Sequence, residues 1–196
     1  MSIAEPEQST ERTVHVSRFS VKQQLTLMVN RFQILATNDD GTEELMAFAS
    51  QKRLRIKEEV NFFRDESMSD KLFSMKSRKA WDGSRTDILD SRGAQMGWFQ
   101  RDWVTSLART TWHLRYGATQ AVGKERSLGV ALARRFLDTP LAYHFDFVNT
   151  ETGDPVLSVT RARSMRDVYL VEAIDRNLDH RVAASMAVAL DVFQCR

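Results

Sequence analysis

DHRVAASMAVALDVFQ, residues 179–194, constrains how the rest of the chain can be arranged. Between Val182 and Phe193 only Ser185 and Asp191 are polar, so a helix here is apolar around nearly its whole circumference. Such a helix must be enclosed by protein or lipid. At about 1.5 Å per residue it is roughly 24 Å long, which is shorter than the hydrocarbon core of a bilayer. We therefore expect a thin, alanine-rich helix that the rest of the protein encloses.

The rest of the chain reads as short strands joined by turns about ten residues apart, which is typical of an all-β barrel or sandwich. Asn, Asp and Gly tolerate a left-handed backbone and mark turns at 38–41, 82–83, 91–93 and 151–154. β-rich or alternating runs predict strands over 25–34, 45–51, 72–78, 86–90, 94–100, 112–116, 143–148, 156–163 and 167–173. Closing this sheet would remove its edges and enclose the helix. The expected fold is mainly β, a closed and mostly antiparallel barrel around a buried C-terminal helix.

Two segments fit less simply into this pattern. Residues 57–63 (KEEVNFF) begin with acids that suit a helical turn and continue with residues that suit a strand. Residues 126–137 (RSLGVALARRFL) carry apolar side chains at helical spacing, which predicts a second helix ended by Pro140. We expect that helix to pack against the barrel wall, with a position on a membrane surface as the alternative.

The composition indicates one domain. The chain has 196 residues, of which 42% are hydrophobic and 28% charged, and its net charge of +2 means that any basic surface must be local. The single cysteine, Cys195, leaves no disulfide within the chain, which fits a reducing cytoplasm. The polar start lacks the pattern of a signal peptide, and no apolar run of about 18 residues predicts a transmembrane helix. We expect residues 1–17 to be a disordered or loosely attached lead-in, residues 18–196 to form the barrel, and the protein to be cytoplasmic.

Several segments, in their order along the chain, resemble the LURF-one-related family, part of the tubby C-terminal-like superfamily that also includes phospholipid scramblases. They are RFQI (31–34), QKRLRIKEEVNFFRDE (51–66), LFSMKSRKAWD (72–82), TDILDSRGAQMGWFQRD (86–102), SLARTTWHL (106–114), YLVEA (169–173) and LDHRVAASMAVALD (178–191). The resemblance runs from about residue 20 to residue 194. It implies a barrel of about twelve strands around a central hydrophobic C-terminal helix.

The same resemblance bears on function. The family has no established general enzymatic activity, and relatives are linked to phosphoinositide binding or to lipid movement across bilayers. Scramblases carry a Pro-rich N-terminal region and a Cys-rich tract, whereas this chain has three prolines and one cysteine. The resemblance therefore favours binding of lipid headgroups over scramblase activity.

A locally basic segment supplies the candidate binding residues. From Lys52 to Lys79 there are nine Lys or Arg residues against five acids. On the outer face of neighbouring strands, such cations can hold an anionic, phosphoinositide-like headgroup through charge-assisted hydrogen bonds. The candidate residues are Arg53, Arg55, Lys57, Lys76, Arg78 and Lys79. The alternatives are an ordinary solvated face with interspersed acids, or a surface that binds a partner protein.

Two further functions stay open at this point. Three tryptophans alternate with arginines in one segment, a pattern that can stack on and neutralise single-stranded nucleic acid. The residues are Trp98, Trp103 and Trp112, and Arg101, Arg109 and Arg115. Tryptophans in a β-rich domain more often pack in the core or at the barrel rim, and we favour that interpretation. A cavity at the barrel mouth would instead suit a small-molecule carrier or an enzyme.

The sequence carries no familiar catalytic or cofactor motif. It contains no nucleophile elbow G-x-S-x-G, no P-loop and no G-x-G-x-x-G. Residues 175–179 (DRNLD) resemble the start of a calcium loop, but His180 and Met186 stand where that loop needs Gly and Glu. We expect Asp179 to act as the N-cap of the terminal helix instead. We therefore expect no catalytic residues, no metal, no cofactor and no enzymatic activity, and the sequence does not indicate an oligomeric state.

Overall fold

A computed structural model describes residues 16–25, 29–38, 40–52, 59–80, 83–102, 110–126, 144–162 and 168–194. These residues form twelve β-strands and one C-terminal helix, α2 (His180–Gln194). The strands are β1 (Arg18–Leu25), β2 (Val29–Thr37), β3 (Glu43–Lys52), β4 (Glu59–Phe63), β5 (Lys71–Ala80), β6 (Gly83–Asp90), β7 (Gln95–Asp102), β8 (Thr111–Tyr116), β9 (Thr119–Glu125), β10 (His144–Asn149), β11 (Pro155–Ala162) and β12 (Val168–Ala173).

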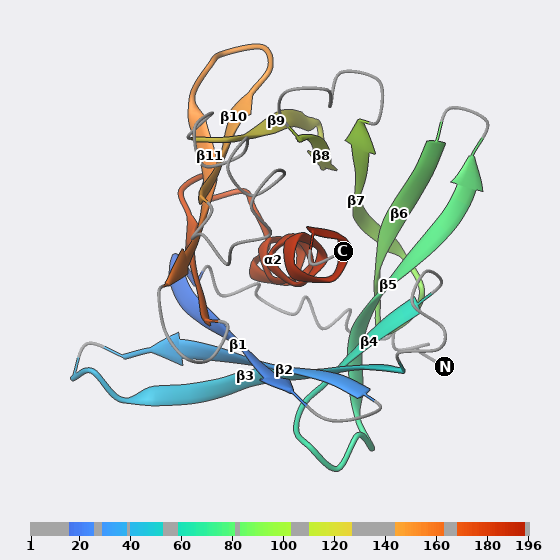
Figure 1. Cartoon of the computed structure of the whole chain (residues 1–196), viewed down its shortest axis with the longest axis vertical. Helices are drawn as coiled ribbons and strands as arrows, with labels where there is room; N and C mark the ends of the chain where they lie inside the picture. The colour runs from blue at the N-terminus through green and yellow to red at the C-terminus, as the bar shows by residue number, and fades with distance from the viewer. Residues whose placement is uncertain are drawn as a thin grey trace, which may run out of the picture.

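The twelve strands form one closed antiparallel barrel. Each strand pairs with the strands before and after it in the chain, and β1 closes the sheet by pairing with β12. In Figure 1 the strands form a ring, and α2 is seen end-on at its centre. Closure leaves neither of the terminal strands with an unpaired edge. The predicted fold class, a closed antiparallel barrel with a C-terminal helix, is confirmed.

The helix fills the interior of the barrel. Every residue from Val182 to Val192 is buried, and Met186, Val188 and Leu190 are 0% exposed. The helix contacts β1, β5, β7 and β12. Alternate strand residues face it, because side chains in a strand point to opposite faces of the sheet. Aromatic residues dominate this inward layer: Phe19, Phe32, Phe62, Phe73, Phe99, Trp112, Phe145, Phe147 and Tyr169.

One carboxylate of the helix lies in this apolar interior. Asp191 is 1% exposed, and its Oδ2 accepts a hydrogen bond from Gln23 Nε2 at 2.9 Å. Its Oδ1 accepts a hydrogen bond from the hydroxyl of Tyr169. A buried carboxylate needs such donors, because burial without them is costly. The two bonds join α2 to β1 and β12 at a defined depth in the barrel.

Asp179 caps the N-terminus of α2, as predicted. Its Oδ1 accepts a hydrogen bond from the backbone N–H of Arg181 at 2.8 Å. Burial acts to raise the pKa of Asp179, but the hydrogen bonds from the side chain and backbone of Arg181 outweigh it, so the pKa lies below its ordinary value. The preceding turn is held by Asp175, whose Oδ1 accepts from Asn177 N at 2.9 Å. This segment is therefore a polar turn that leads into a capped helix.

The structure corrects the prediction near the N-terminus. The single strand predicted over 25–34 is divided between two strands, because β1 ends at Leu25 and β2 begins at Val29. The alternation of β1 is hidden in the sequence by Gln23, a polar residue at a buried position. Its place inside the barrel follows from its hydrogen bond to Asp191.

Two other segments show what the sequence patterns missed or left open. β9 was not predicted, because TQAVGKE has few apolar residues and contains Gly123. A Cβ at Gly123 would lie 2.3 Å from the ring of Phe147, so packing on β10 requires glycine there. The ambiguous segment 57–63 contains strand β4. The helix predicted over 126–137, apart from Arg126, and the first residue of the turn predicted at 82–83 lie outside the described residues.

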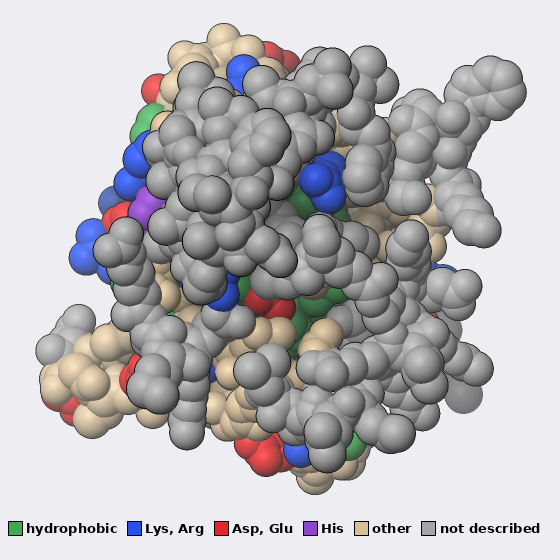
Figure 2. All heavy atoms as spheres, viewed as in Figure 1, with side chains coloured by type: hydrophobic (Ala, Val, Ile, Leu, Met, Phe, Trp, Pro, Cys, Tyr) green, Lys and Arg blue, Asp and Glu red, His purple; other side chains and the backbone are tan. Residues whose placement is uncertain are grey.

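Charged side chains of both signs are spread over the outer surface. At the left edge of the view in Figure 2, Lys and Arg side chains lie beside acidic side chains and a histidine. Two such pairs join neighbouring strands. Arg18 Nη2 lies 2.8 Å from Glu172 Oε1, and Arg126 Nη2 lies 2.6 Å from Asp146 Oδ1. Each of these two arginines thus has its own carboxylate.

Candidate anion-binding site on the outer wall

A row of directly opposed residues crosses the outer wall of the barrel from β5 to β8. Lys76 lies opposite Asp87, Asp87 opposite Trp98, and Trp98 opposite Arg115. Directly opposed residues share one face of a sheet, and the exposed Lys76 and Arg115 show that this face is the outer one. Four strands far from the chain termini therefore bring two cations, a carboxylate and an indole together.

The carboxylate of Asp87 organises the centre of this wall. It lies on the outer face but is only 1% exposed, because longer side chains cover it. Arg85 Nε donates to its Oδ1 at 3.0 Å, and Gln95 Nε2 donates to the same oxygen at 2.9 Å. Arg78 Nε forms an ion pair with Oδ2. One buried carboxylate thus holds side chains from β5, β6 and β7.

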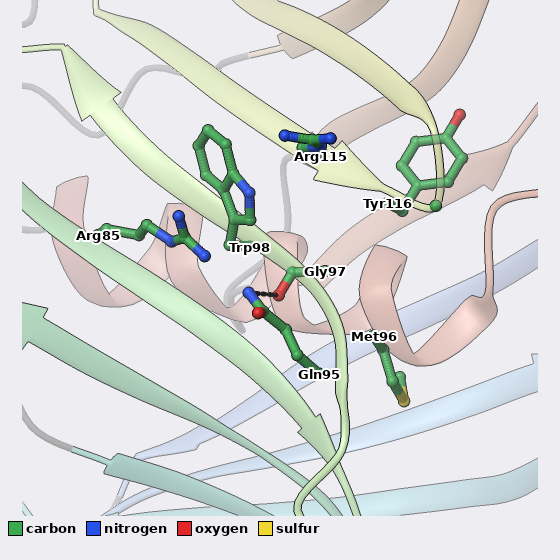
Figure 3. Close-up of a pocket in the computed structure, with 8 residues that line it drawn as sticks. Arg85, Gln95, Met96, Gly97, Trp98, Arg115 and Tyr116 are labelled. Atoms are coloured by element: carbon green, nitrogen blue, oxygen red, sulfur yellow. Dashed lines mark hydrogen bonds between the residues drawn. The ribbon is translucent and has the colours of Figure 1, made fainter.

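Trp98 provides an aromatic surface beside this cluster. The guanidinium carbon of Arg85 lies 4.6 Å from the centre of the Trp98 ring, a cation–π contact. In Figure 3 the indole lies between the side chains of Arg85 and Arg115. The cation–π contact and the ion pair with Asp87 together hold the Arg85 guanidinium over the Trp98 ring.

A pocket of about 300 Å³ opens at this point. That volume is at the small end for ligand pockets, so it suits a headgroup or a small anion better than an acyl chain. The pocket is lined by Arg85, Gln95, Met96, Gly97, Trp98, Arg115, Tyr116 and Gly117. It lies where the β6–β7 and β8–β9 hairpins meet, on the wall of the barrel and not inside it, where α2 is buried.

The inner side of the pocket is tied to the start of the central helix. The Tyr116 hydroxyl donates to Asp175 Oδ2 at 2.5 Å, and Asp175 lies in the turn before α2. Burial, helped by this hydrogen bond to a carboxylate, raises the pKa of Tyr116 above its ordinary range, so the phenol stays neutral. Gly97 permits the strands to approach closely, because a Cβ there would lie 2.5 Å from the backbone oxygen of Arg115. The pocket therefore has a rigid base.

The predicted binding residues fall into two groups. Lys76 and Arg78 lie on the outer face of β5, as predicted. Lys79 belongs to β5 and lies opposite Ser84, but its side chain is outside the described residues. Arg53, Arg55 and Lys57 are also outside the described residues. The proposed role of all six in binding stays a prediction.

The residues that complete the wall were missed by the sequence analysis. Asp87 was not considered, and a simple hairpin around residues 91–93 would place Gly97 opposite it. The real register is shifted by a β-bulge, in which Met96 has no direct partner and Trp98 lies opposite Asp87. A bulge of this kind leaves little trace in the sequence, so the cluster of Arg85, Asp87 and Trp98 needed coordinates.

The segment proposed for nucleic-acid binding is divided between two faces of the barrel. Trp98 and Arg115 are on the outer wall, whereas Trp112 is 2% exposed and packs edge-to-face on Phe99, with ring centres 5.9 Å apart. Arg101 lies opposite Trp112, and burial lowers the pKa of the Arg101 guanidinium. Trp103 and Arg109 are outside the described residues. The described tryptophans therefore do not form one stacking surface.

Comparisons with known proteins give similarities among solved structures only. No family model and no curated protein matches the chain. Among solved structures, the X-ray structure of protein AT5G01750 from Arabidopsis thaliana is similar over 93% of this chain and 94% of that one, with 12% identity and a TM-score of 0.35. The strand pairing of the molecule itself, and not this similarity, establishes the barrel architecture. Membership of the LURF-one-related family stays a prediction.

The described residues contain no group of His, Cys, Asp or Glu side chains that could hold a metal ion. Within the same ranges, no helix has both the length and the apolar character needed to cross a membrane.

Proposed function

We propose that this protein is a non-enzymatic, tubby-like barrel of the LURF-one-related type that binds anionic lipid headgroups through the outer wall of β5–β8. The observation that carries the proposal is the balance of charge on that wall. Lys76, Arg78, Arg85 and Arg115 lie around the carboxylate of Asp87, while Glu59 lies opposite Lys76 on β4 and Asp102 pairs with His113 at the far end of β7. Within the described part of the chain, neither Lys76 nor Arg115 forms an ion pair.

The mechanism is electrostatic attraction followed by hydrogen bonding. Each Lys or Arg close to an anionic membrane surface contributes about 1 kcal/mol, and the attraction fades over a Debye length of about 8 Å in physiological salt. Lys76 and Arg115 supply positive charge that is not held in an ion pair among the described residues. Arg78 and Arg85 supply planar guanidinium groups, which match the geometry of phosphate oxygens. The protein would therefore act as a peripheral protein at the cytoplasmic face of a membrane.

The proposal is tested by co-sedimentation with vesicles. The full chain is mixed with vesicles of phosphatidylcholine alone, and with vesicles in which part of the phosphatidylcholine is replaced by phosphatidylserine or phosphatidylinositol 4-phosphate. We expect binding to the anionic vesicles that weakens as salt rises. The double variant Lys76→Gln with Arg115→Gln should weaken binding by roughly thirtyfold, because it removes two contributions of about 1 kcal/mol.

A matched control removes the same charge from another part of the barrel. Arg18→Gln with Lys22→Gln neutralises two cations on β1 that already have carboxylate partners, Glu172 and Glu43. This control should bind anionic vesicles within a fewfold of the wild type. No binding of the wild type to any anionic vesicle at low salt would reject the proposed function. Equal losses in the two double variants would reject the β5–β8 wall as the binding surface.

A further inference from the structure

The two arginines that contact Asp87 present their terminal nitrogens in a particular way. Both contacts use Nε: Arg85 Nε donates to Oδ1 at 3.0 Å, and Arg78 Nε pairs with Oδ2. A guanidinium carries five N–H donors, so the Nη groups remain to donate elsewhere. The Arg78 side chain is 68% exposed and the Arg85 side chain 35% exposed, so these groups are accessible to a ligand.

Trp98 adds a second restraint on Arg85. Its ring holds the guanidinium by a cation–π contact at 4.6 Å, while Asp87 fixes the Nε edge. A guanidinium restrained on one edge and one face has little rotational freedom to lose when a ligand binds. The same contact covers part of the indole, which leaves less aromatic surface for stacking a nucleic-acid base.

The pocket beside Arg85 suits the free end of a phosphate group. Arg85 and Arg115 lie on either side of Trp98, and the amide of Gln95 is also in the lining. A phosphate monoester presents three unsubstituted oxygens and a charge of about −1.5 to −2 near neutral pH. A diester carries one charge and has only two unsubstituted oxygens, so it offers fewer acceptors to the donors of this pocket.

We infer that Asp87 is a positioning residue, which sets Arg85 in the pocket lining and Arg78 on the neighbouring strand beside it, so that the site selects a phosphate monoester over a phosphate diester. This inference rests on the proposed function. It assigns Asp87 a role opposite to the one its charge suggests: a carboxylate should weaken anion binding, yet here it orients the cations that make binding selective. The overall attraction for anions and the preference for a monoester therefore depend on different groups, so each can be tested with its own variants.

The experiment compares two vesicles of equal surface potential. One contains phosphatidylcholine with phosphatidic acid, a monoester, and the other phosphatidylcholine with phosphatidylglycerol, a diester, with the fractions adjusted to the same zeta potential. We expect the wild type to prefer the monoester vesicle by about tenfold, the effect of one additional charge-assisted hydrogen bond. Asp87→Asn should bring that ratio close to one, while binding to the diester vesicle rises about fivefold because a negative charge is removed.

A second variant keeps the inference testable if Asp87→Asn does not fold. Arg85→Lys keeps the positive charge but has no Nε edge for Asp87 and no planar group over Trp98. It should also lose the preference, with little change in binding to the diester vesicle. Lys76→Gln is the matched control, because Lys76 lies opposite Asp87 on the same wall but, among the described residues, forms neither a hydrogen bond nor an ion pair with its carboxylate. It should weaken binding to both vesicles in the same proportion.

The outcomes separate the two proposals. If the wild type binds both vesicles equally, or if Asp87→Asn strengthens binding to both in proportion, Asp87 is only a counter-charge and the inference is overturned, although lipid binding stands. If the wild type binds neither vesicle at low salt, both proposals fail. Titration calorimetry with glycerol 3-phosphate identifies the source of the monoester. If glycerol 3-phosphate binds the wild type and loses affinity in Arg85→Lys, the ligand is a free phosphate ester. If the preference for the monoester is seen only with vesicles, the ligand is a lipid.

Discussion

Two walls of the barrel use arginine in different ways. On the wall formed by β9, β10, β11, β12 and β1, Arg126, the residue after β9, donates through Nε and Nη2 to the two oxygens of Asp146, each at 2.6 Å, and Arg18 pairs with Glu172. On the β5–β8 wall, Arg78 and Arg85 share the carboxylate of Asp87. Strand pairing is antiparallel in both walls. The difference lies in the ratio of carboxylates to cations.

That ratio is the basis for proposing one wall, and not the other, as a binding surface. A bidentate pair such as Arg126 with Asp146 uses the donors of its guanidinium on its own carboxylate, which leaves fewer for a ligand. Two arginines that share one carboxylate through Nε keep their Nη groups for a ligand. The comparison therefore favours the β5–β8 wall as the proposed binding surface, without reference to any relative.

The largest effect is expected from a change that breaks the β5–β8 wall itself. Gly97→Ala would place a Cβ 2.5 Å from the backbone oxygen of Arg115, so β7 and β8 would have to separate. We expect a loss of about 2 to 4 kcal/mol in the free energy of unfolding, measured in urea, and weaker binding to anionic vesicles. Gly117→Ala is the control in the same pocket. It meets no atom within 4 Å, and its cost should be about 1 kcal/mol, from a φ of +50°. Equal costs would contradict the close packing of these strands.

The next prediction compares the central carboxylates of the two walls. Asp87→Ala should lower the free energy of unfolding by about 2 kcal/mol, because it removes the buried hydrogen-bond acceptor of Arg85 and Gln95 and the ion-pair partner of Arg78. Asp146→Ala should cost less than about 1 kcal/mol, because the side chains of Asp146 and Arg126 are 39% and 55% exposed. Urea unfolding of both variants checks this order. The reverse order would show that the shared carboxylate is not the structural centre of its wall.

The fold was predictable from the sequence because its main signals are local. The apolar circumference of residues 182–193 requires an enclosing sheet, and the alternating strands with their turns supply one. These local signals fail at positions where a tertiary contact determines which residue type the fold needs. Gln23 faces inward because it binds Asp191, and Gly123 is in a strand because Phe147 packs over it. In both cases the partner is distant in sequence or on another strand.

The candidate site was predictable only in part, for a related reason. Alternation within β5 places Lys76 and Arg78 on one face, and this much the sequence indicates. Which residues of β6 and β7 they meet depends on the register, and the bulge at Met96 shifts that register by one position. A shift of one residue exchanges the two faces of a strand. The grouping of Asp87 with Trp98 therefore could not be derived from periodicity.

The smallest effect concerns how the two walls respond to acid. Hydrogen bonds from Arg126 hold the pKa of Asp146 below its ordinary value of 3.8, although burial opposes them. Because the folded pKa is the lower one, the stabilisation by this pair is complete above about pH 4 and is lost as the pH falls through the folded pKa. Arg126→Gln should therefore lower the Tm by about 1 to 2 °C at pH 7, and its difference from the wild type should shrink below pH 4. Lys76→Gln removes a cation without an ion pair among the described residues, so its Tm difference should stay constant over the same range. A Tm difference that shrinks equally in both variants would mean that the two walls do not differ in how their cations are compensated.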